Sequence, residues 1–343
     1  MRIFKFDTRL LMVSVVVISI LSMSIGVFAE PQKERKIIIF KHSTTESEKE
    51  LVFRENGAVK VKDLSCIQGA VVYVPSNHKL NEEKSVIFIE DDYLVTVSSE
   101  PVKQPKVVPP PSMPAEVIPW GINWMDAPMQ WNVNTGESIK VAVIDTGIAL
   151  NHSDLKANIK GGINVISKKG TPNDDNGHGT HVAGIIAAVR NQIGVVGMAP
   201  DADLYAVKVL DSAGNGYVSD IITGISWCIN NKMDILNMSF GIPSNSIALH
   251  DIITQANDIG IKMVAAAGNN YGGTAVYPAA YPEVISVGAI DQTGNIASFS
   301  AIQNVDMYAP GADIFSTYTN DGYLHMSGTS MAAPHYVGLL ILK

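Results

Sequence analysis

The segment Lys140-Val-Ala-Val-Ile-Asp-Thr-Gly147 decides the fold of this chain. Apolar residues fill positions 141–144, and a carboxylate and a turn follow at once, which is typical of a strand buried in a parallel sheet. Comparable runs occur at residues 204–210, 234–238, 262–267 and 284–289. From about residue 118 onward, the chain is therefore predicted to form an α/β fold with an open, mostly parallel sheet.

Between these runs, apolar residues recur at helical spacing. One set comprises Val218, Ile221, Ile222, Ile225, Cys228 and Ile229, and another comprises Leu249, Ile252, Ile253 and Ala256. Each set predicts an amphipathic helix whose apolar side packs on the sheet. We expect helices on both faces of the sheet, because an apolar strand that alternates with helices is covered on both sides.

The composition excludes several classes of protein. Of the 343 residues, 46% are hydrophobic and 17% are charged, which indicates a large buried core. The 25 Lys and Arg residues against 33 Asp and Glu residues give a net charge of -8, and no basic stretch is long enough to follow a phosphate backbone. We therefore expect no nucleic-acid partner. The two cysteines, Cys66 and Cys228, provide no disulfide framework.

The N-terminal residues predict a secretory signal peptide over residues 1–29. An apolar run at 10–27 follows three basic residues, Arg2, Lys5 and Arg9. Ala29 supplies a small residue at the cleavage point. We therefore expect the mature protein to be secreted. A permanent membrane anchor is the alternative, since the apolar run approaches the length that spans a bilayer.

Residues 30–100 predict a separate small domain. Strands are expected at 35–41, 58–64, 70–74 and 86–89 and a helix at 45–55, so this domain has an α+β fold. Residues 101–114 contain six prolines and predict a linker, because proline-rich chains favour extended conformations over packed elements. The larger α/β domain then occupies residues 115–343.

Three polar residues stand where this fold places chemistry. Asp145 directly follows the strand at 141–144, and active sites collect at the carboxyl ends of parallel strands. His178 lies between two glycines before an apolar helix, and Ser330 opens another, whose free N–H groups stabilise negative charge. Taken alone, Asp145 is also explained as a turn cap and Ser330 as a helix cap. A metal pair of His178 and His181 lacks the i, i+4 spacing and intervening Glu of zinc proteases.

Together these residues supply the parts of a serine hydrolase. A serine hydroxyl becomes nucleophilic when an imidazole takes its proton, and the imidazole needs a carboxylate to fix its tautomer. The chain order Asp145, His178, Ser330 differs from that of the α/β-hydrolases, and no Gly-x-Ser-x-Gly motif surrounds Ser330. A lipase of that class is therefore excluded.

Three segments resemble the signature segments of the subtilisin-like serine proteases, in the order of that family. They are Val143-Ile-Asp-Thr-Gly147, His178-Gly-Thr-His-Val-Ala-Gly184 and Gly328-Thr-Ser-Met-Ala-Ala-Pro-His335. The resemblance implies a serine endopeptidase that forms an acyl-enzyme on Ser330. It also implies that Asn269 shares the stabilisation of the oxyanion with the backbone N–H of Ser330. Without the resemblance, Gly268-Asn269 is explained as a turn after a strand.

The resemblance implies polypeptide substrates bound mainly through their backbone. Two edge segments, Gly214-Asn215-Gly216 and Ser239-Phe240-Gly241, are expected to pair with an extended substrate strand. Ala266, Gly268 and Val276 correspond to the family's first specificity pocket. Val276 stands where a smaller residue is common, so we expect a shallower pocket.

The resemblance also implies a structural calcium site. Side-chain oxygens are expected from Glu116, Asp154 and Asn191, and carbonyl oxygens from Val189, Ile193 and Val195. Ligation by oxygen alone suits Ca²⁺. The alternative is that Asp154 caps a surface turn and the loop binds no ion. Asp174 and Asp175 are candidates for a second cation, and no organic cofactor is expected.

The N-terminal domain resembles the inhibitory propeptide of the family. This implies a precursor that cleaves itself between Val97 and Ala115, with the propeptide as intramolecular inhibitor and a monomeric product. Family members usually continue beyond the helix that contains Lys343, so we expect a catalytic domain truncated at its C-terminus. The alternative function is a catalytically silent binding or inhibitory protein with this fold.

Overall fold

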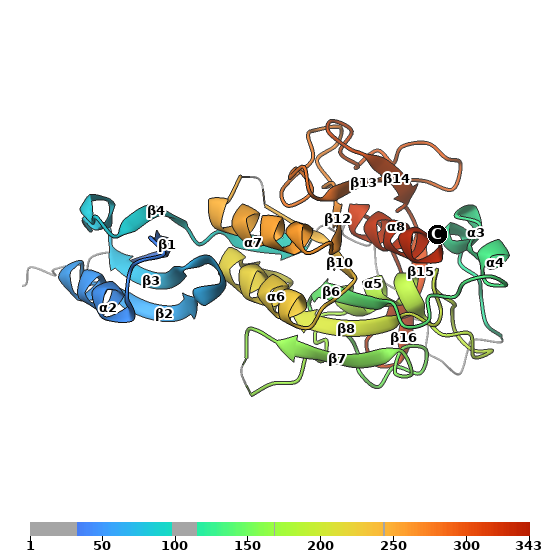
Figure 1. The fold of residues 1–343 in the computed structure, drawn as a ribbon. Helices are drawn as coiled ribbons and strands as arrows, with labels where there is room; N and C mark the ends of the chain where they lie inside the picture. Colours follow the sequence, from blue (N-terminus) through green and yellow to red (C-terminus); the bar gives the residue numbers. More distant parts are fainter. Residues whose placement is uncertain (1–32, 98–114, 168, 243) are drawn as a thin grey trace, which may run out of the picture.

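A computed structural model describes residues 33–97 and 115–343, except for residues 168 and 243. The predicted signal peptide at 1–29 and the predicted linker at 101–114 lie outside the described residues. A small N-terminal unit and a larger α/β unit lie side by side (Figure 1). Among the described residues, no helix combines the length and the apolar character needed to cross a bilayer.

The larger unit is built on a seven-stranded sheet in which every neighbouring pair is parallel. From edge to edge its strands are β14 (Met307–Pro310), β13 (Ile285–Ile290), β12 (Lys262–Ala266), β10 (Ile235–Met238), β6 (Lys140–Asp145), β8 (Asp203–Lys208) and β7 (Ile159–Asn164). The predicted parallel α/β sheet is confirmed. The sequence does not predict the edge strands β7 and β14, because neither contains a long apolar run.

Two pairs of helices cover the two faces of this sheet (Figure 1). Helices α5 (His178–Ala187) and α8 (Thr329–Leu342) pack on one face, and α6 (Val218–Asn230) and α7 (Ile247–Asp258) pack on the other. The residues of β6 alternate accordingly. Val141 and Val143 join the core with α5 and α8, whereas Ala142 and Ile144 join the core with α6 and α7. Burial on both faces explains why residues 141–144 of β6 are all apolar.

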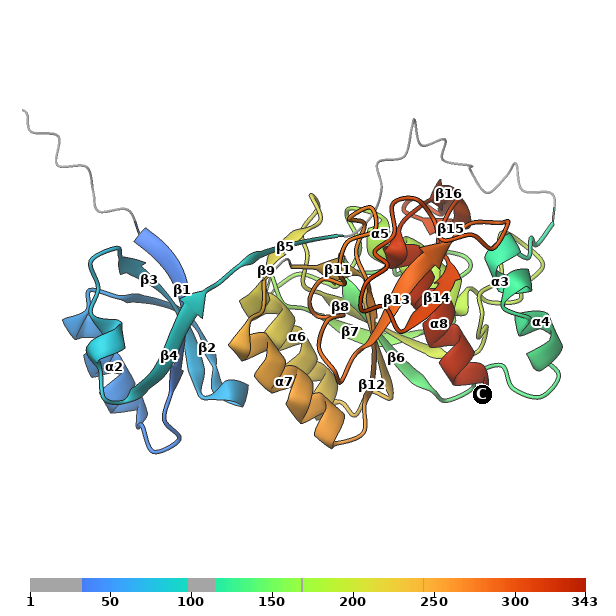
Figure 2. The ribbon, with the colours of Figure 1, turned by 90° about the horizontal axis from the view of Figure 1, so that it is seen from above.

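Shorter elements complete the larger unit (Figure 2). Helix α3 (Trp120–Trp124) lies beside β14, and α4 (Ala127–Gln130) lies beside α8. The antiparallel hairpin of β15 (Ile314–Tyr318) and β16 (Gly322–Met326) packs on α5. This packing is close because Gly184 has no side chain: a Cβ atom there would lie 2.2 Å from Thr317 Oγ1.

The N-terminal unit is an antiparallel sheet with one helix, so the predicted α+β arrangement is confirmed. Its strands lie in the order β2 (Val59–Leu64), β3 (Gly69–Pro75), β1 (Lys33–Phe40) and β4 (Val86–Asp91). Helix α2 (Glu46–Glu55) begins with a reciprocal cap between Thr45 and Glu48. Two short 3₁₀ helices, η1 (Ser65–Ile67) and η2 (Leu80–Glu82), follow β2 and β3.

Both faces of the smaller sheet are also covered. Ile38 and Phe40 of β1 pack with α2 in the core of the unit itself, whereas Ile37 and Ile39 join the core that contains α6 and α7. The two units therefore share an apolar interface. Cys66 lies partly buried against the same core as the buried Cys228, and both thiols are free, as expected.

Strand β5 (Leu94–Val97) connects the two units. It leaves the N-terminal unit and lies between β9 (Asn215–Tyr217) and β11 (Phe240–Gly241) in a three-stranded antiparallel sheet (Figure 2). The sequence does not predict β5, because its pairing partners lie more than a hundred positions away in the chain.

Candidate active site

The predicted catalytic residues lie at the carboxyl edge of the large sheet. Asp145 ends β6, His178 begins α5, and Ser330 is the second residue of α8. All three residues are buried, with exposures of 0%, 1% and 0%. The structure brings Asp145 and His178, which are 33 positions apart in the chain, into contact, and it places Ser330 against the segment that follows β10.

The imidazole of His178 is held by the carboxylate of Asp145. Nδ1 of His178 lies 2.8 Å from Oδ1 and 2.9 Å from Oδ2 of Asp145. Oδ1 also accepts the backbone N–H of Thr146 at 2.7 Å. An ionised carboxylate only accepts hydrogen bonds, so Nδ1 carries the proton and Nε2 of the neutral ring carries a lone pair. Among the described residues, Nε2 has no hydrogen-bond partner.

Ser330 is connected to the segment after β10. Its hydroxyl donates to the carbonyl of Ser239 at 3.0 Å, and the Ser239 hydroxyl donates to the carbonyl of Ser330 at 2.9 Å. Asn237, the third residue of β10, donates to the Ser239 hydroxyl at 2.9 Å. Transfer of the Ser330 proton to His178 therefore requires the hydroxyl to turn away from Ser239.

Asn269 is oriented by the residue before Ser330. Its Oδ1 accepts the N–H and the hydroxyl of Thr329, both at 3.0 Å. Thr329 in turn accepts the N–H of Gly268 at 3.1 Å. These bonds identify Oδ1 as the acceptor and leave Nδ2 as the donor of the amide. Sequence reasoning missed Thr329, although it stands next to Ser330 in the motif that carried the resemblance.

The two predicted substrate-binding edges hold a strand of the chain itself. Thr96 and Val95 of β5 pair with Asn215 and Gly216 of β9, and on the other side Val97 and Thr96 pair with Phe240 and Gly241 of β11. Val97 also donates its N–H to the carbonyl of Gly214 at 3.2 Å. Gly214 permits this contact, because its φ is 77° and a Cβ atom there would lie 3.0 Å from Val97. β9 and β11 therefore hold an extended strand of the chain itself through backbone pairing.

The three residues predicted to line the first specificity pocket lie close together. Ala266 ends β12, and Gly268 follows it with a φ of 107°. A Cβ atom on Gly268 would lie 3.1 Å from Cγ2 of Val276. The Val276 side chain therefore occupies the space beside Gly268 that a smaller residue would leave open.

The predicted calcium ligands surround one loop of the larger unit. Glu116 accepts the N–H of Asn191 at 2.8 Å. Asp154, which has no exposed surface, accepts hydrogen bonds from Asn191 Nδ2, Val195 N and Tyr323 Oη, each at 2.9 Å. Burial raises the pKa of Asp154, while these hydrogen bonds oppose the shift.

These residues fit a calcium ion. The hydrogen-bond donors to Asp154 among the described residues are neutral, so a cation would balance its buried charge. Within the described residues, the carbonyl oxygens of Val189, Ile193 and Val195 accept no hydrogen bond. The described part of the chain contains no cluster of three or more Asp, Glu, His or Cys side chains suited to a metal, so ligation here would depend on the carbonyls.

Asp174 and Asp175, the candidates for a second cation, have different partners within the described residues. Asp175 forms an ion pair of 2.8 Å with the buried Lys208, which sequence reasoning missed. Asp174 is surrounded by N–H and O–H donors. His181 is equally unsuited to a metal pair with His178, since its Nε2 bonds the carbonyls of Ile314 and Leu324. Burial lowers the pKa of His181 to about 3, so this ring is neutral.

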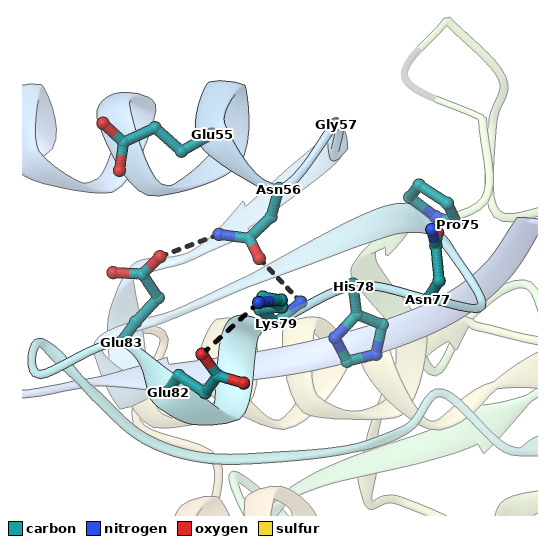
Figure 3. Close-up of a pocket in the computed structure, with 9 residues that line it drawn as sticks. All are labelled: Glu55, Asn56, Gly57, Pro75, Asn77, His78, Lys79, Glu82 and Glu83. Carbon is teal, nitrogen blue, oxygen red and sulfur yellow. Dashed lines mark hydrogen bonds and ion pairs between the residues drawn. The ribbon is translucent and has the colours of Figure 1, made fainter.

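A separate hollow of about 550 Å³ lies in the N-terminal unit, away from these residues (Figure 3). Its polar groups satisfy one another: Asn56 Nδ2 donates to Glu83 at 2.9 Å, and the N–H of Lys79 donates to Asn56 Oδ1 at 2.9 Å. Lys79 also lies 4.0 Å from the carboxylate of Glu82. No polar group in this set points to a ligand.

The geometry defines the class of protein first. A buried carboxylate that holds an imidazole, with a buried serine at a helix start on the same edge of the sheet, is typical of a serine hydrolase. The pairing of β5 between β9 and β11 shows that these two strands can bind an extended polypeptide strand.

Comparison with known proteins then identifies the family. The profile of the subtilase family matches residues 136–342. The chain is 44% identical over 266 residues to a thermostable alkaline protease of Halalkalibacterium halodurans, which covers 77% of this chain and 68% of that protein. It is 47% identical over 230 residues to subtilisin Savinase of Lederbergia lenta, an alignment that covers 66% of this chain and 84% of that protein. It is 39% identical over 334 residues to subtilisin NAT of Bacillus subtilis subsp. natto, an alignment that covers 94% of this chain and 83% of that protein. The chain belongs to the subtilase family and is a serine endopeptidase.

We predict that Thr329→Val lowers kcat about 10- to 100-fold and leaves KM nearly unchanged. This loss is smaller than the roughly 100- to 1,000-fold loss of kcat in subtilisin when the oxyanion donor itself is removed. Valine has the shape of threonine but cannot donate to Asn269 Oδ1, so the amide loses one of the bonds that orient it. Steady-state kinetics with a chromogenic peptide measure both constants. Thr329→Ser keeps the hydroxyl and is the matched control. Equal kcat values for the two variants would contradict the orienting role.

Proposed function

We propose that the chain is the precursor of a secreted, autoprocessing serine endopeptidase that acts through Asp145, His178, Ser330 and Asn269. The observation that carries this proposal is the position of β5, a polypeptide strand that lies between the two predicted substrate-binding segments. The segment that forms one side of this groove also bonds Ser330 through Ser239. A peptide bound in the groove is therefore brought to the Ser330 hydroxyl.

In the proposed mechanism, His178 acts first as general base and then as general acid. Its Nε2 takes the Ser330 proton. Asp145 stays ionised, accepts the hydrogen bond from Nδ1–H at 2.8 Å and so stabilises the imidazolium. The Ser330 oxygen attacks the substrate carbonyl, and Asn269 Nδ2 and the Ser330 N–H donate to the oxyanion. His178 then protonates the leaving amine. Water hydrolyses the acyl-enzyme by the same sequence of proton transfers.

We assign residues 30–100 as an inhibitory propeptide and residues 115–343 as the catalytic domain. Similarity supports this assignment, because the alignment with subtilisin NAT covers 94% of the chain and so extends well into the N-terminal unit. The basic and apolar pattern of residues 1–29 supports export through a signal peptide. The mature product is proposed to be monomeric and to cleave polypeptides.

Two carboxylates of the N-terminal unit support the inhibitory role. Glu90 accepts the Ser246 hydroxyl at 2.7 Å and the Ile247 N–H at 2.9 Å, at the start of α7. Asp92 accepts the N–H and the hydroxyl of Ser219 at 2.9 and 2.8 Å, in the first turn of α6. Negative charge is stabilised at helix N-termini. These bonds hold the unit against α6 and α7, while β5 occupies the two substrate-binding segments.

A catalytically silent binding protein is the second candidate, and the same strand favours it. A chain whose own β5 never leaves the groove would keep the fold and lack activity. The two candidates differ in whether Ser330 cuts the connection between the units.

We also propose that Glu116, Asp154 and Asn191, with the carbonyls of Val189, Ile193 and Val195, hold a structural Ca²⁺. Two carboxylates, an amide and three carbonyl oxygens form a donor set of hard oxygen ligands, which Ca²⁺ prefers. The bound ion would stabilise the loop at residues 189–195 and the segment that contains Glu116. It takes no part in the chemical step.

We predict that the native chain loses a fragment that ends between Val97 and Ala115, whereas Ser330→Ala stays intact. Only the native chain has the nucleophile, so only it forms the acyl-enzyme at its own peptide bond. Intact-mass spectrometry of both purified precursors over time, with calcium, measures the products. Ser327→Ala changes a serine that directly precedes the Ser330 motif and accepts the N–H of Asp313, and this variant should be cut like the native chain. If folded native protein remains uncut, the silent binding protein is the correct function.

We predict that Val276→Gly raises kcat/KM for a peptide with Phe at P1 at least about tenfold relative to its Ala counterpart, because a few methyl groups decide the size that a pocket accepts. The glycine removes the side chain that lies beside Gly268. Paired chromogenic tetrapeptides that differ only at P1 measure the ratio. Val133→Gly, at an exposed position outside the groove, is the matched control. An unchanged Phe to Ala ratio would show that Val276 does not limit the pocket.

We predict that excess Ca²⁺ stabilises Ser330→Ala by about 2.7 to 4.1 kcal/mol, as expected when the ion exceeds its Kd 100- to 1,000-fold. The additional substitution Asp154→Asn should abolish this gain, because it removes the buried negative charge. Urea unfolding with Ca²⁺, with Mg²⁺ and with a chelator measures the free energy of unfolding. Glu137→Gln, at an exposed position, should keep the full gain. A gain that survives Asp154→Asn places the ion elsewhere.

A further inference from the structure

Helix α5 begins without a side-chain cap of its own. Its N-cap is Gly177, with a φ of 114°, so the first N–H groups need acceptors from other segments. His178 N donates to Asn176 Oδ1 at 3.0 Å, and Gly179 N donates to the hydroxyl of Thr146 at 3.0 Å. Thr180 N donates to Asp174 Oδ2 at 3.0 Å. The start of the helix that carries His178 is therefore held by side chains from outside it.

Asp174 is the centre of this set of bonds. It is 4% exposed, and its two oxygens accept five hydrogen bonds. Besides the Thr180 N–H, the donors are the Thr180 hydroxyl at 2.6 Å, the N–H groups of Asn176 and Gly177 at 2.9 Å, and the Thr146 hydroxyl at 2.9 Å. No cation pairs with Asp174 in the described part of the chain. Its charge is stabilised by N–H and O–H donors from two segments, Thr146 after β6 and residues 176–180 at the start of α5.

Thr146 connects this carboxylate to Asp145. Its N–H donates to Asp145 Oδ1 at 2.7 Å, and its hydroxyl donates to Asp174 at 2.9 Å while it accepts the Gly179 N–H. Its carbonyl accepts Lys208 Nζ at 2.6 Å. The backbone segments are close, since a Cβ atom on Gly179 would lie 2.2 Å from the carbonyl of Gly147. Small displacements of Thr146 therefore move Asp145 relative to the first turn of α5.

We propose that Asp174 is a positioning residue of the proteolytic site: it sets the geometry of the bond between Asp145 and His178 by binding Thr146 on one segment and the first turn of α5 on the other. It contacts no reacting atom and acts through Thr146 and the helix start. This inference rests on the proposed roles of Asp145 and His178 and adds the group that fixes their separation.

The test uses Thr146, because Asp174→Asn would place an amide N–H₂ against N–H donors and so prevent folding. Thr146→Val keeps the shape but removes the hydroxyl that joins Asp174 to Gly179. Thr146→Ser keeps this hydroxyl. Asn158→Ala is the stability control, since Asn158 Nδ2 donates to the carbonyls of Ala187 and Pro200 at the far end of α5.

For the processed enzyme, we expect Thr146→Val to lower kcat about 10- to 100-fold with KM within about twofold, since small misplacements of catalytic groups have effects of this size. The acidic limb of the pH profile of kcat/KM should move to lower pH, because a looser bond to Asp145 stabilises the imidazolium of His178 less. Thr146→Ser and Asn158→Ala should keep kcat and the profile, although Asn158→Ala lowers the melting temperature. Native kcat and pH profile in a destabilised Thr146→Val protein would overturn the proposal.

A second measurement separates this proposal from the proposed function. In a Ser330→Ala background, the downfield proton resonance of His178 Nδ1 reports the bond to Asp145 without any turnover. We expect Thr146→Val to shift or broaden this resonance, and Thr146→Ser and Asn158→Ala to leave it in place. An unmoved resonance in Thr146→Val overturns the positioning role even if the native chain is an active protease. A shifted resonance supports that role even if the native chain cuts nothing.

Discussion

The structure depends on a parallel sheet that is buried on both faces. Parallel strands require crossovers, so helices cover both faces and every strand of the sheet ends at the same edge. Asp145 ends β6, and Ser239 and Asn269 follow closely on β10 and β12. Helices α5 and α8 begin at this same edge and supply His178 and Ser330. The site is therefore a consequence of where the strands stop.

The groove beside this edge follows from unpaired backbone. Strands β9 and β11 are short, and each offers N–H and C=O groups that a third strand can satisfy. In this structure β5 lies between the two strands and pairs with both of them. Glycine is needed at two positions in or next to these strands. A Cβ atom on Gly214 would lie 3.0 Å from Val97 of β5, and a Cβ atom on Gly216 would lie 2.3 Å from the carbonyl of Val209. Recognition through the backbone suits an enzyme that accepts many polypeptide sequences.

Buried charge is treated differently at each position around the site. Asp145 has the imidazole of His178, Lys208 has Asp175 and two carbonyls, and Asp174 has five N–H and O–H donors. Asp154 has three neutral donors, and burial raises its pKa. An unpaired buried charge is costly, so each of these groups constrains the segments that surround it. These constraints fix the positions of the side chains in the site.

By itself, the sequence determined the fold class, the central strands and helices, and the identity of the residues that meet at the sheet edge. These features follow from local apolar patterns and from short motifs, which the chain carries at one place each. Only the tertiary structure decided the strand β5, the edge strands β7 and β14, and the partners of Asp174, Thr329 and Lys208. Pairing of β5 and the bonds of these side chains join residues that are distant in the chain, and no local pattern encodes such partners. Folding brings them together because buried backbone and side-chain polar groups require acceptors and donors wherever the packed elements place them.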